Sequence, residues 1–359
     1  MSLIKCYRVN RKARVSQKKD RDILRQHIHS VVDLTKEEKH QIANKWKCTI
    51  PVPISRGFDF FLGMKYLNGF DPNYLPPCYY APYILDALNI PAYKKILNHK
   101  SLLQIAYGNG IKHPRTVIRS YGGLLLDENY HALLRHEAAA IIKKQNCPLL
   151  YKPAMDSSQG KKIQVLANTE DIEEICKGLV NGELIKKGDF VIQEPVAQST
   201  NTELFNPTSL NCMRITTFRV NDYISVGSSA IKCGPAGSFV DNIGSGKKGV
   251  IVGIDRDGQL HKYGFYGNGE RTAAHNGVEF KDKKIMHFDR VINAAIELHN
   301  YVEGCRIIGW DLALDNQDDP VLIEGNVCSP GIRFEQMCSG PIFGDRTDEV
   351  IGFIKKNLG

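Results

Sequence analysis

The stretch over residues 309–326 constrains the fold more than any other, because it places polar side chains within two apolar runs. Two short apolar segments flank a polar turn that ends in proline, and this pattern predicts a β-hairpin or meander. Asp311 interrupts the first segment, while Glu324 and Asn326 end the second. Residues two apart on a strand point to the same face, so we expect Glu324 and Asn326 to lie together.

A carboxylate in the core of a strand is costly unless it is paired or bound to a cation. Asp311, Glu324 and Asn326 offer two carboxylates and one amide oxygen, a hard-ligand set that suits Mg²⁺ and leaves room for substrate phosphates. The alternative is that Asp311 merely ends a strand and Glu324 pairs with an arginine. For one carboxylate that alternative is the simpler one, but three such side chains on adjacent strands favour the metal site.

Composition places the chain among ordinary globular proteins. Of 359 residues, 42% are hydrophobic and 24% charged, which is enough for two or three lobes around a sizeable core. No run approaches the ~20 apolar residues of a membrane helix, and the first residues lack the apolar core of a secretory signal. Ten cysteines without a C-x-x-C pair argue against a zinc module and predict reduced thiols in a cytoplasmic protein.

The positive charge is concentrated at the N-terminus. Residues 1–25 hold nine Lys or Arg against two Asp, which accounts for +7 of the net charge of +8. Such a segment could contact anionic lipid or a polyanionic substrate, but a run of this kind is more often simply a solvated helix face. No aromatic-rich strand accompanies it, so a nucleic-acid partner is not expected.

The apolar spacing predicts a mixture of helices and strands. Residues 11–46 are expected to be helical, with Thr35 and Glu38 forming a capping box. Residues 47–92 are rich in proline and aromatic residues, which predicts a packed region of short helices. Further helices are expected over 100–107, 130–145, 169–180 and 285–303. Strands are expected after a turn within 111–118, and over 149–153, 163–166, 190–194, 214–232 and 249–254.

Two strand ends in the middle of the chain could hold a nucleotide. Lys152 precedes a loop with Ser and Gly that runs to Lys162, and loop N–H groups with a lysine can hold phosphate oxygens. Taken alone, a strand-end lysine before a polar turn is more often simply a surface residue. The strand over 190–194 ends in Gln193 and Glu194, which could serve a purine and a ribose or could simply terminate the strand.

The segment over 211–220 alternates with period two and places Arg214 and Arg219 on opposite faces. One of these arginines is expected to face a cleft, because a guanidinium is well suited to clamping a transferring phosphoryl group. A glycine-rich turn over 241–246 can approach a substrate closely.

These features together resemble the ATP-grasp superfamily in their order and spacing. The matching residues are Lys152 with its loop, Gln193, Glu194, Asn211, Arg214, Asp311, Glu324 and Asn326. The Gln-Glu-Pro-Val, Gly-Trp-Asp and Leu-Ile-Glu-Gly-Asn motifs more narrowly resemble the sugar-transfer-associated ATP-grasp family of exopolysaccharide biosynthesis. The resemblance covers about residues 95–340, and its C-terminal motif is the most specific part.

The resemblance implies roles for the matching residues. The catalytic residues would be Arg214, which would steady the γ-phosphoryl group and the acyl intermediate, and Lys152, which would contact the α- and β-phosphates. ATP contacts would come from Lys100, Lys152, Ser158, Gly160, Gln193, Glu194, Val196, Asn211, Asp311 and Glu324. Mg²⁺, as two ions bridged by Glu324, would be held by Asp311, Glu324 and Asn326. The loop over 157–160 is poorer in glycine than is usual, and Lys247 and Lys248 follow the later glycine turn, which leaves the loop contacts open.

The implied architecture is an α+β ATP-grasp fold in which two α+β lobes clasp ATP. The lobes would span 98–195 and 196–359, after an N-terminal helical and Pro/aromatic-rich region over 1–97. The implied reaction is ligation of a carboxylate to an amine, with an amino acid or other carboxylate joined to a sugar or polysaccharide precursor. A kinase of the same fold and a non-catalytic component of a glycan-assembly complex are the alternatives.

Two further residues are candidates for the second substrate. His275 lies in a loop and could act near that substrate, although such a histidine can equally be merely exposed. Arg333 follows the predicted metal hairpin closely enough in sequence to bind a carboxylate.

Overall fold

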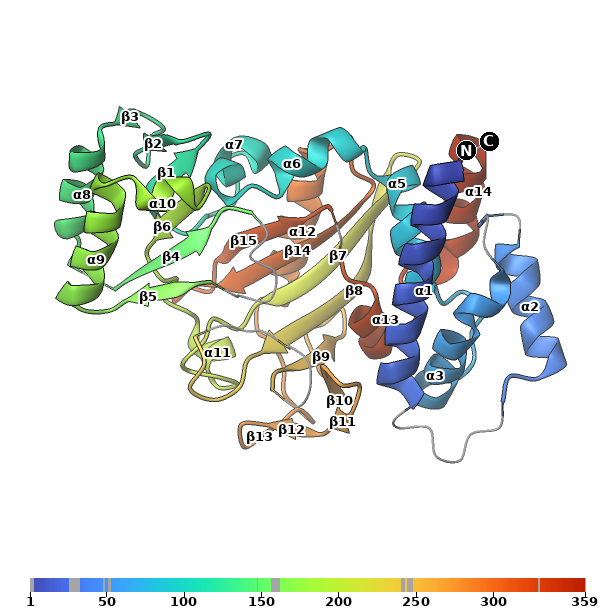
Figure 1. Ribbon diagram of the computed structural model, residues 1–359. Coiled ribbons are helices and arrows are strands. Elements are labelled where there is room, and N and C mark those ends of the chain that lie inside the picture. The colour runs from blue at the N-terminus through green and yellow to red at the C-terminus, as the bar shows by residue number, and fades with distance from the viewer. Residues whose placement is uncertain are drawn as a thin grey trace.

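Two antiparallel sheets and an N-terminal helical region organise the molecule (Figure 1). The computed structural model describes residues 3–25, 33–47, 49–50, 53–146, 148–155, 162–239, 243, 248–328 and 330–358. None of the described helices is both long and apolar enough to cross a bilayer. The predicted α+β architecture is confirmed.

The small lobe is a six-stranded sheet in the order β3-β2-β1-β6-β4-β5, with all neighbours antiparallel. Its strands are β1 (Thr116–Tyr121), β2 (Leu124–Leu126), β3 (Ala132–Leu133), β4 (Leu149–Pro153), β5 (Gln164–Leu166) and β6 (Phe190–Gln193). The helices α8 (Arg135–Lys143), α9 (Thr169–Val180) and α10 (Glu183–Lys186) complete the lobe. Their apolar residues share one core with the sheet.

The helix predicted over 130–145 is too long at its start. Residues 132–133 form β3 instead, and Tyr130 adopts a positive φ of 66°. The carboxylate of Glu137 accepts a hydrogen bond from the Leu134 backbone N–H at 2.7 Å, which caps α8 where it begins. The helix predicted over 169–180 is confirmed as α9, where Asn168 caps the first turn.

The large lobe is a seven-stranded antiparallel sheet in the order β11-β10-β9-β8-β7-β14-β15. Its strands are β7 (Met213–Val220), β8 (Tyr223–Cys233), β9 (Val250–Ile254), β10 (Leu260–Tyr266), β11 (Arg271–Thr272), β14 (Ile307–Leu314) and β15 (Pro320–Asn326). A separate hairpin joins β12 (Ala274–His275) to β13 (Val278–Glu279). The predicted acidic hairpin is therefore β14–β15, and the strands predicted over 214–232 are the hairpin β7–β8.

Helices cover both faces of the large sheet. The helix α12 (Phe288–Asn300) packs on β7, β8 and β14, and α13 (Arg333–Ser339) packs on β8, β9 and β10. The remaining helices of this lobe and of the connection between the lobes are α6 (Lys94–Leu97), α7 (Leu103–Tyr107), α11 (Thr200–Glu203) and α14 (Thr347–Leu358), with single turns η3 (Pro91–Tyr93), η4 (Lys100–Leu102) and η6 (Gly344–Arg346). The predicted helix over 100–107 is thus η4 followed by α7, which ends at Gly108 with a φ of 70°.

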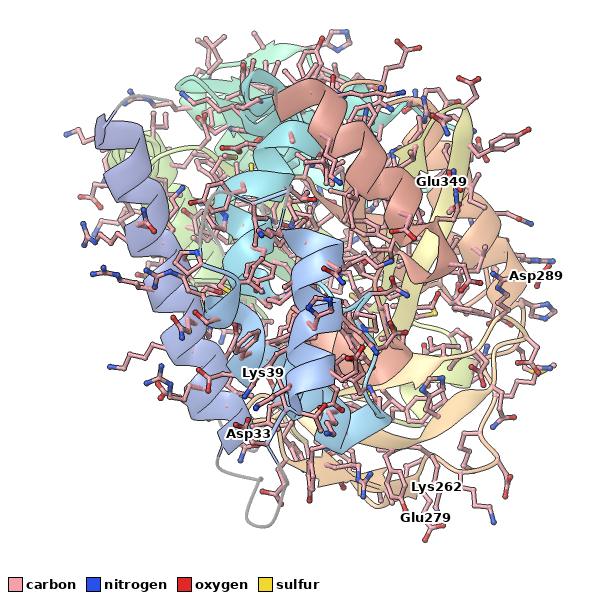
Figure 2. All side chains as sticks on the ribbon, turned by 90° about the vertical axis from the view of Figure 1, so that its right-hand side faces the viewer. Asp33, Lys39, Lys262, Glu279, Asp289 and Glu349 are labelled. Carbon is pink, nitrogen blue, oxygen red and sulfur yellow. The ribbon has the colours of Figure 1, made fainter. Side chains whose placement is uncertain are left out.

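The N-terminal region consists of helices and turns. They are α1 (Leu3–Arg25), α2 (Lys36–Trp46), η1 (Ile54–Gly57), α3 (Phe58–Asn68), α4 (Pro77–Tyr79), η2 (Tyr80–Ile84) and α5 (Leu85–Leu88). The predicted capping box starts α2, because Thr35 Oγ1 accepts from Glu38 N–H and the Glu38 carboxylate accepts from Thr35 N–H. At the same end of α2, Lys39 pairs with Asp33 at 3.2 Å (Figure 2).

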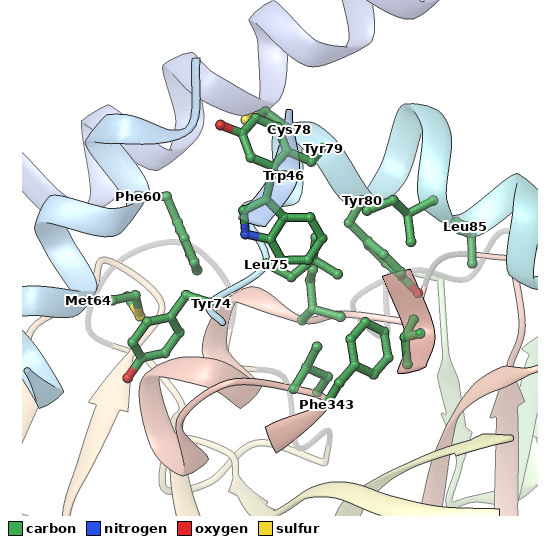
Figure 3. Packing of buried hydrophobic residues seen from close by; sticks show 14 of the residues in the cluster. Trp46, Phe60, Met64, Tyr74, Leu75, Cys78, Tyr79, Tyr80, Leu85 and Phe343 are labelled. Carbon is green, nitrogen blue, oxygen red and sulfur yellow. The ribbon is translucent and has the colours of Figure 1, made fainter. Parts of the chain in front are cut away.

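The described residues of this region share their core with the large lobe. Trp46, Phe60 and Tyr79 pack together with Phe343 from the C-terminal part of the chain (Figure 3). The same apolar cluster includes residues of the large sheet, such as Phe218. The N-terminal helices therefore cover part of one face of that sheet, and they are bound to it by the hydrophobic effect.

Two buried titratable groups hold segments of the fold together. Asp20 of α1 is 1% exposed and pairs with Arg333 of α13 at 2.6 Å; burial raises the pKa of Asp20 to about 6, against the attraction of Arg333. His299 of α12 is fully buried and hydrogen-bonds to Thr217 Oγ1 at 2.7 Å and to the Cys305 carbonyl at 2.9 Å. Burial lowers the pKa of His299 to about 4.

We expect these two groups to oppose each other between about pH 4 and pH 6. Folded Asp20 keeps a proton that the unfolded chain releases, so its contribution falls as pH rises, whereas folded His299 stays neutral while the unfolded chain is protonated, so its contribution grows. Each effect is worth about 3 kcal/mol. In Asp20→Asn the unfolding free energy should therefore rise with pH more steeply than in the wild type. In His299→Gln the unfolding free energy should fall as the pH rises. Urea unfolding at a series of pH values measures this, and parallel curves for wild type and variants would contradict it.

Candidate active site

The strand register brings the predicted metal residues together on one face of the large sheet. Asp311 lies in β14 between its cross-strand partners Arg214 in β7 and Glu324 in β15. Asn326 pairs with Gly309 two residues away on the same face. The hairpin thus brings Asp311, Glu324 and Asn326 together, as the sequence predicted.

Asp311 is the centre of the site. It is 7% exposed, and it receives Arg214 Nε on Oδ1 at 2.8 Å and Arg214 Nη2 on Oδ2 at 3.0 Å. Lys232 Nζ lies 3.1 Å from Oδ1, and Asn326 Nδ2 donates to Oδ2 at 3.2 Å. Burial alone would raise the pKa of Asp311, but Arg214 and Lys232 outweigh it and hold the pKa well below its usual range. Asp311 is therefore a permanent carboxylate.

Two further ion pairs extend the cluster. Glu335 of α13 accepts from Arg214 Nη1 at 3.3 Å, so this arginine lies between two carboxylates. Burial would lower the pKa of Arg214, but Asp311 and then Glu335 raise it. Lys100 Nζ lies 3.1 Å from Glu324, and the Lys100 N–H donates to the Ala154 carbonyl at 3.1 Å. Lys100 therefore links the end of β4 in the small lobe to β15 in the large lobe.

The described cluster is balanced in charge, with three cations facing three carboxylates. These are Lys100, Arg214 and Lys232, and Asp311, Glu324 and Glu335. A magnesium triphosphate carries both signs of charge, so its phosphate oxygens can take the cations while the carboxylates turn to the metal.

The donor set fits magnesium only in company with a phosphate. No three His, Cys, Asp or Glu side chains of the described residues lie close enough to hold a metal ion by themselves. Mg²⁺ is commonly bound through one or two carboxylates plus substrate phosphates, and Asp311 with Glu324 supplies two. The side chain of Glu324 is 28% exposed, so it is the more accessible of the two carboxylates.

The residues predicted to hold the base and ribose follow the edge of the small sheet. Gln193 ends β6 and is 4% exposed. Its side-chain Nε2 donates a hydrogen bond to Thr116 Oγ1 at 2.9 Å. Glu194 pairs with Arg115 through its carboxylate and donates its N–H to the Arg115 carbonyl at 3.0 Å. Val196 is half-buried just beyond.

Lys152 lies on β4, next to β6, and is half-buried. Its register partner is Val191, so Lys152 and the end of β6 belong to neighbouring strands. Ser158 and Gly160, predicted to bind phosphates, lie outside the described residues, as do most residues of the glycine turn over 241–246.

Three predicted residues have mainly structural contacts. Asn211 is fully buried, and its Nδ2 donates to Gln198 Oε1 and to the Thr202 and Asn206 carbonyls, so it braces the loop before β7. His275 is not an exposed loop residue, because it is 7% exposed and bonds to the Gly234 carbonyl at 2.9 Å. Arg333 binds a carboxylate as predicted for its chemistry, but that carboxylate is Asp20.

Sequence reasoning missed Lys232 and Glu335. Lys232 is a lone cation near the end of the apolar strand β8, and this isolation was the available signal. Glu335 is 5% exposed on α13, a short helix whose partner strands lie far away in sequence. Neither contact follows from local spacing.

Side chains on the opposite face of the sheet fix the positions of β7, β14 and β15. Trp310 donates its Nε1–H to Thr217 Oγ1 at 2.7 Å, and Thr217 in turn contacts His299. Gly325, between Glu324 and Asn326, leaves space for Tyr107, because a Cβ there would lie 2.2 Å from the tyrosine hydroxyl. The glycine in the Glu-Gly-Asn motif is thus required by a close approach.

Comparison with known proteins identifies the family. The model for the sugar-transfer associated ATP-grasp family matches residues 83–351. Because this match covers most of the chain, the protein belongs to the sugar-transfer associated ATP-grasp family, which confirms the resemblance noted in the sequence. No curated protein sequence matches the chain.

Solved structures with a similar fold include several ligases at low sequence identity. VanG D-Ala:D-Ser ligase from Enterococcus faecalis is 14% identical, with a TM-score of 0.43 over 72% of this chain and 62% of that chain. D-alanyl-alanine synthetase A from Vibrio cholerae is 9% identical, with a TM-score of 0.44 over 74% and 66%. The biotin carboxylase domain of 2-oxoglutarate carboxylase from Hydrogenobacter thermophilus, solved with MgADP, is 13% identical, with a TM-score of 0.43 over 72% and 46%. The matches span about half to two thirds of those chains.

We expect substitutions at the two central carboxylates to separate stability from activity. Asp311→Asn leaves Arg214 and Lys232 buried without their partner, so it should lower the unfolding free energy by about 3–5 kcal/mol. Glu324→Gln disturbs only the more exposed pair with Lys100, so its melting temperature should stay close to that of the wild type.

Nucleotide turnover should nevertheless fall on the order of a hundredfold in Glu324→Gln, because one of the two carboxylates predicted to bind Mg²⁺ is lost. Asp289→Asn, an exposed carboxylate on α12 (Figure 2), is the matched control for loss of one negative charge. Calorimetry and steady-state ADP release measure the two quantities. Equal destabilisation by both site variants, or normal turnover in Glu324→Gln, would contradict the assignment.

Proposed function

We propose that this protein is an ATP- and Mg²⁺-dependent carboxylate–amine ligase that acts through an acyl phosphate. The observation that carries the proposal is the charge-balanced cluster around Asp311, in which cations and carboxylates are held ready on one sheet face. Phosphoryl transfer asks a protein mainly for positioning and for neutralisation of charge, and this cluster offers both.

The proposed reaction has two steps. A carboxylate oxygen of the first substrate attacks the γ-phosphorus of ATP, the bond to the β–γ bridging oxygen breaks, and ADP leaves. The amine of the second substrate then attacks the acyl carbon, the C–O bond to the phosphate breaks, and inorganic phosphate leaves with the electron pair of that bond and takes up the proton that the amine loses. Neither step requires a covalent bond to the enzyme, in keeping with a site built of ionic groups.

Each side chain of the cluster has a part in this scheme. Arg214 and Lys232 bind the oxygens of the transferring phosphoryl group, and Arg214 then steadies the acyl phosphate. Lys100 and Lys152 bind the phosphates from the small-lobe side. Gln193, Glu194 and Val196 line the adenosine site, where Glu194 must exchange Arg115 for the ribose.

Asp311, Glu324 and Asn326 are the residues that would hold Mg²⁺. The metal supplies Lewis-acid neutralisation of phosphate charge when it is bound. Asn326 currently donates its amide to Asp311, so its amide oxygen is the atom available to a cation.

The family assignment supports a sugar or polysaccharide precursor as one substrate, with an amino acid or another carboxylate as its partner. The seven cysteines whose side chains the structure describes carry reduced thiols, which supports a reducing, cytoplasmic location. The second candidate is a kinase, because the same phosphate-binding groups would serve a hydroxyl acceptor. In that case the reaction would end after phosphoryl transfer.

The products distinguish the two activities. With a panel of amino acids, uronic acids and amino sugars, a ligase releases ADP and inorganic phosphate in equal amounts, and hydroxylamine should trap the acyl phosphate as a hydroxamate. Oxygen-18 in the substrate carboxylate should appear in the released phosphate. A kinase gives ADP and a phosphorylated product, with no free phosphate.

The proposal also predicts that MgATP raises the melting temperature of the wild type and not that of Glu324→Gln, because only the wild type retains both carboxylates. Absence of any MgATP effect on melting, together with no ADP release across the panel, would overturn the proposed function. Asp289→Asn, which leaves the site intact, should behave as the wild type in both measurements.

A further inference from the structure

The helix α1 has one face against the protein and one face in solvent. Ala13, Asp20 and Ile23 are buried, and their spacing marks the inner stripe of an amphipathic helix. The opposite side is exposed and carries five cations within nine residues: Arg11, Lys12, Arg14, Lys18 and Lys19. These five residues are called the outer basic face of α1.

The outer basic face makes no ion pair within the described part of the chain, although Asp22 lies one turn beyond Lys18 on the same helix. None of its five cations lies within 4.0 Å of a described carboxylate, whereas the neighbouring Arg21 pairs with Asp59. Arg14 and Lys18 stand four residues apart, and Arg11 and Arg14 three, so like charges face each other along the helix. This repulsion weakens the helix, and an anionic partner would relieve it.

The shape of this surface favours a flat partner. The five cations span about 12 Å along a straight helix, at 1.5 Å per residue. Figure 2 shows α1 at the margin of the molecule, with side chains extending away from the body. Cations on one convex ridge can reach a single plane together, which matches the headgroup surface of an anionic bilayer.

The contact would be electrostatic and not inserted. Val15, 64% exposed, is the large apolar residue among the cations, and one valine gives little anchoring in lipid. The outer basic face contains no aromatic side chain on which a nucleobase could stack.

The inner side of the same helix leads to the active site. Asp20 holds Arg333 at 2.6 Å, and Glu335, two residues further along α13, contacts Arg214. A surface bound by α1 would therefore lie close to the site.

We propose that the outer basic face of α1 docks this protein on anionic lipid membranes. The docking is independent of the proposed ligase activity, because it needs neither nucleotide nor substrate. It would place the active site beside a surface from which a lipid-attached anionic substrate could be drawn.

Vesicle flotation tests the docking with the full-length protein. Wild type should bind vesicles containing about a third phosphatidylserine in phosphatidylcholine, and should not bind phosphatidylcholine alone. Raising the salt from about 0.1 M to about 1 M should release it, because the Debye length falls from ~10 Å to ~3 Å.

The decisive comparison uses two variants with the same net charge. One carries Arg11→Gln, Lys12→Gln, Arg14→Gln, Lys18→Gln and Lys19→Gln, and should lose on the order of a thousandfold in partitioning, at roughly fivefold per residue. The matched control neutralises five exposed lysines of the small lobe, with Lys143→Gln, Lys144→Gln, Lys177→Gln, Lys186→Gln and Lys187→Gln, and should bind as the wild type.

A smaller variant, Lys18→Gln with Lys19→Gln, guards against misfolding and should lose about 25-fold; circular dichroism checks the helix content of each variant. Equal losses in the helix variant and the control, no loss in either, or failure of the wild type to bind phosphatidylserine vesicles would overturn the proposal. So would release of wild type from vesicles by a soluble anionic polysaccharide at matched charge concentration, since the preferred partner would then be a polymer. ADP release by the helix variant in solution reports separately on the proposed function.

Discussion

The burial of the Asp311 carboxylate is the constraint on which the site depends. A charge in this position is stable only because Arg214 donates a hydrogen bond to each carboxylate oxygen and Lys232 adds a second cation. These partners come from β7 and β8, so the ionic requirement of one residue ties three strands in a fixed register. Apolar packing of Trp310 on the opposite face holds the same strands from behind.

One face of the large sheet is apolar at one end and polar at the other. The apolar end contains Phe218 and Ile307 and is covered by the N-terminal helices. The polar end contains Arg214 and Asp311. The change occurs within four residues along β7 and along β14. The N-terminal region is therefore an integral part of the fold, because it covers the sheet beside the ionic cluster. Its Asp20 also pairs with Arg333 of α13, and Glu335 of the same helix pairs with Arg214.

The sequence was sufficient where information was local. Period-two alternation and a polar turn predicted the hairpin that pairs Asp311 with Glu324, and a capping pattern predicted the start of α2. It was insufficient where the decisive contact spans strands. Lys232 and Glu335 reach the site only through pairings with distant segments, and the burial of Asn211 depends on how a loop folds back on itself. No spacing rule encodes such contacts.

The two central ion pairs differ in what ligand binding asks of them. The pair of Arg214 with Asp311 is buried, bidentate and supported by further partners, so breaking it outright would strand charges in a medium of low dielectric constant. The pair of Lys100 with Glu324 is single and partly exposed, so water can stabilise its members while they separate. Exchange of partners with a magnesium nucleotide should therefore begin at Lys100 and Glu324. Because Lys100 is also fixed by its backbone to the end of β4, the proposed exchange begins where the two lobes meet. The buried pair of Arg214 with Asp311 opens only when phosphate oxygens and the metal replace the partners that it loses.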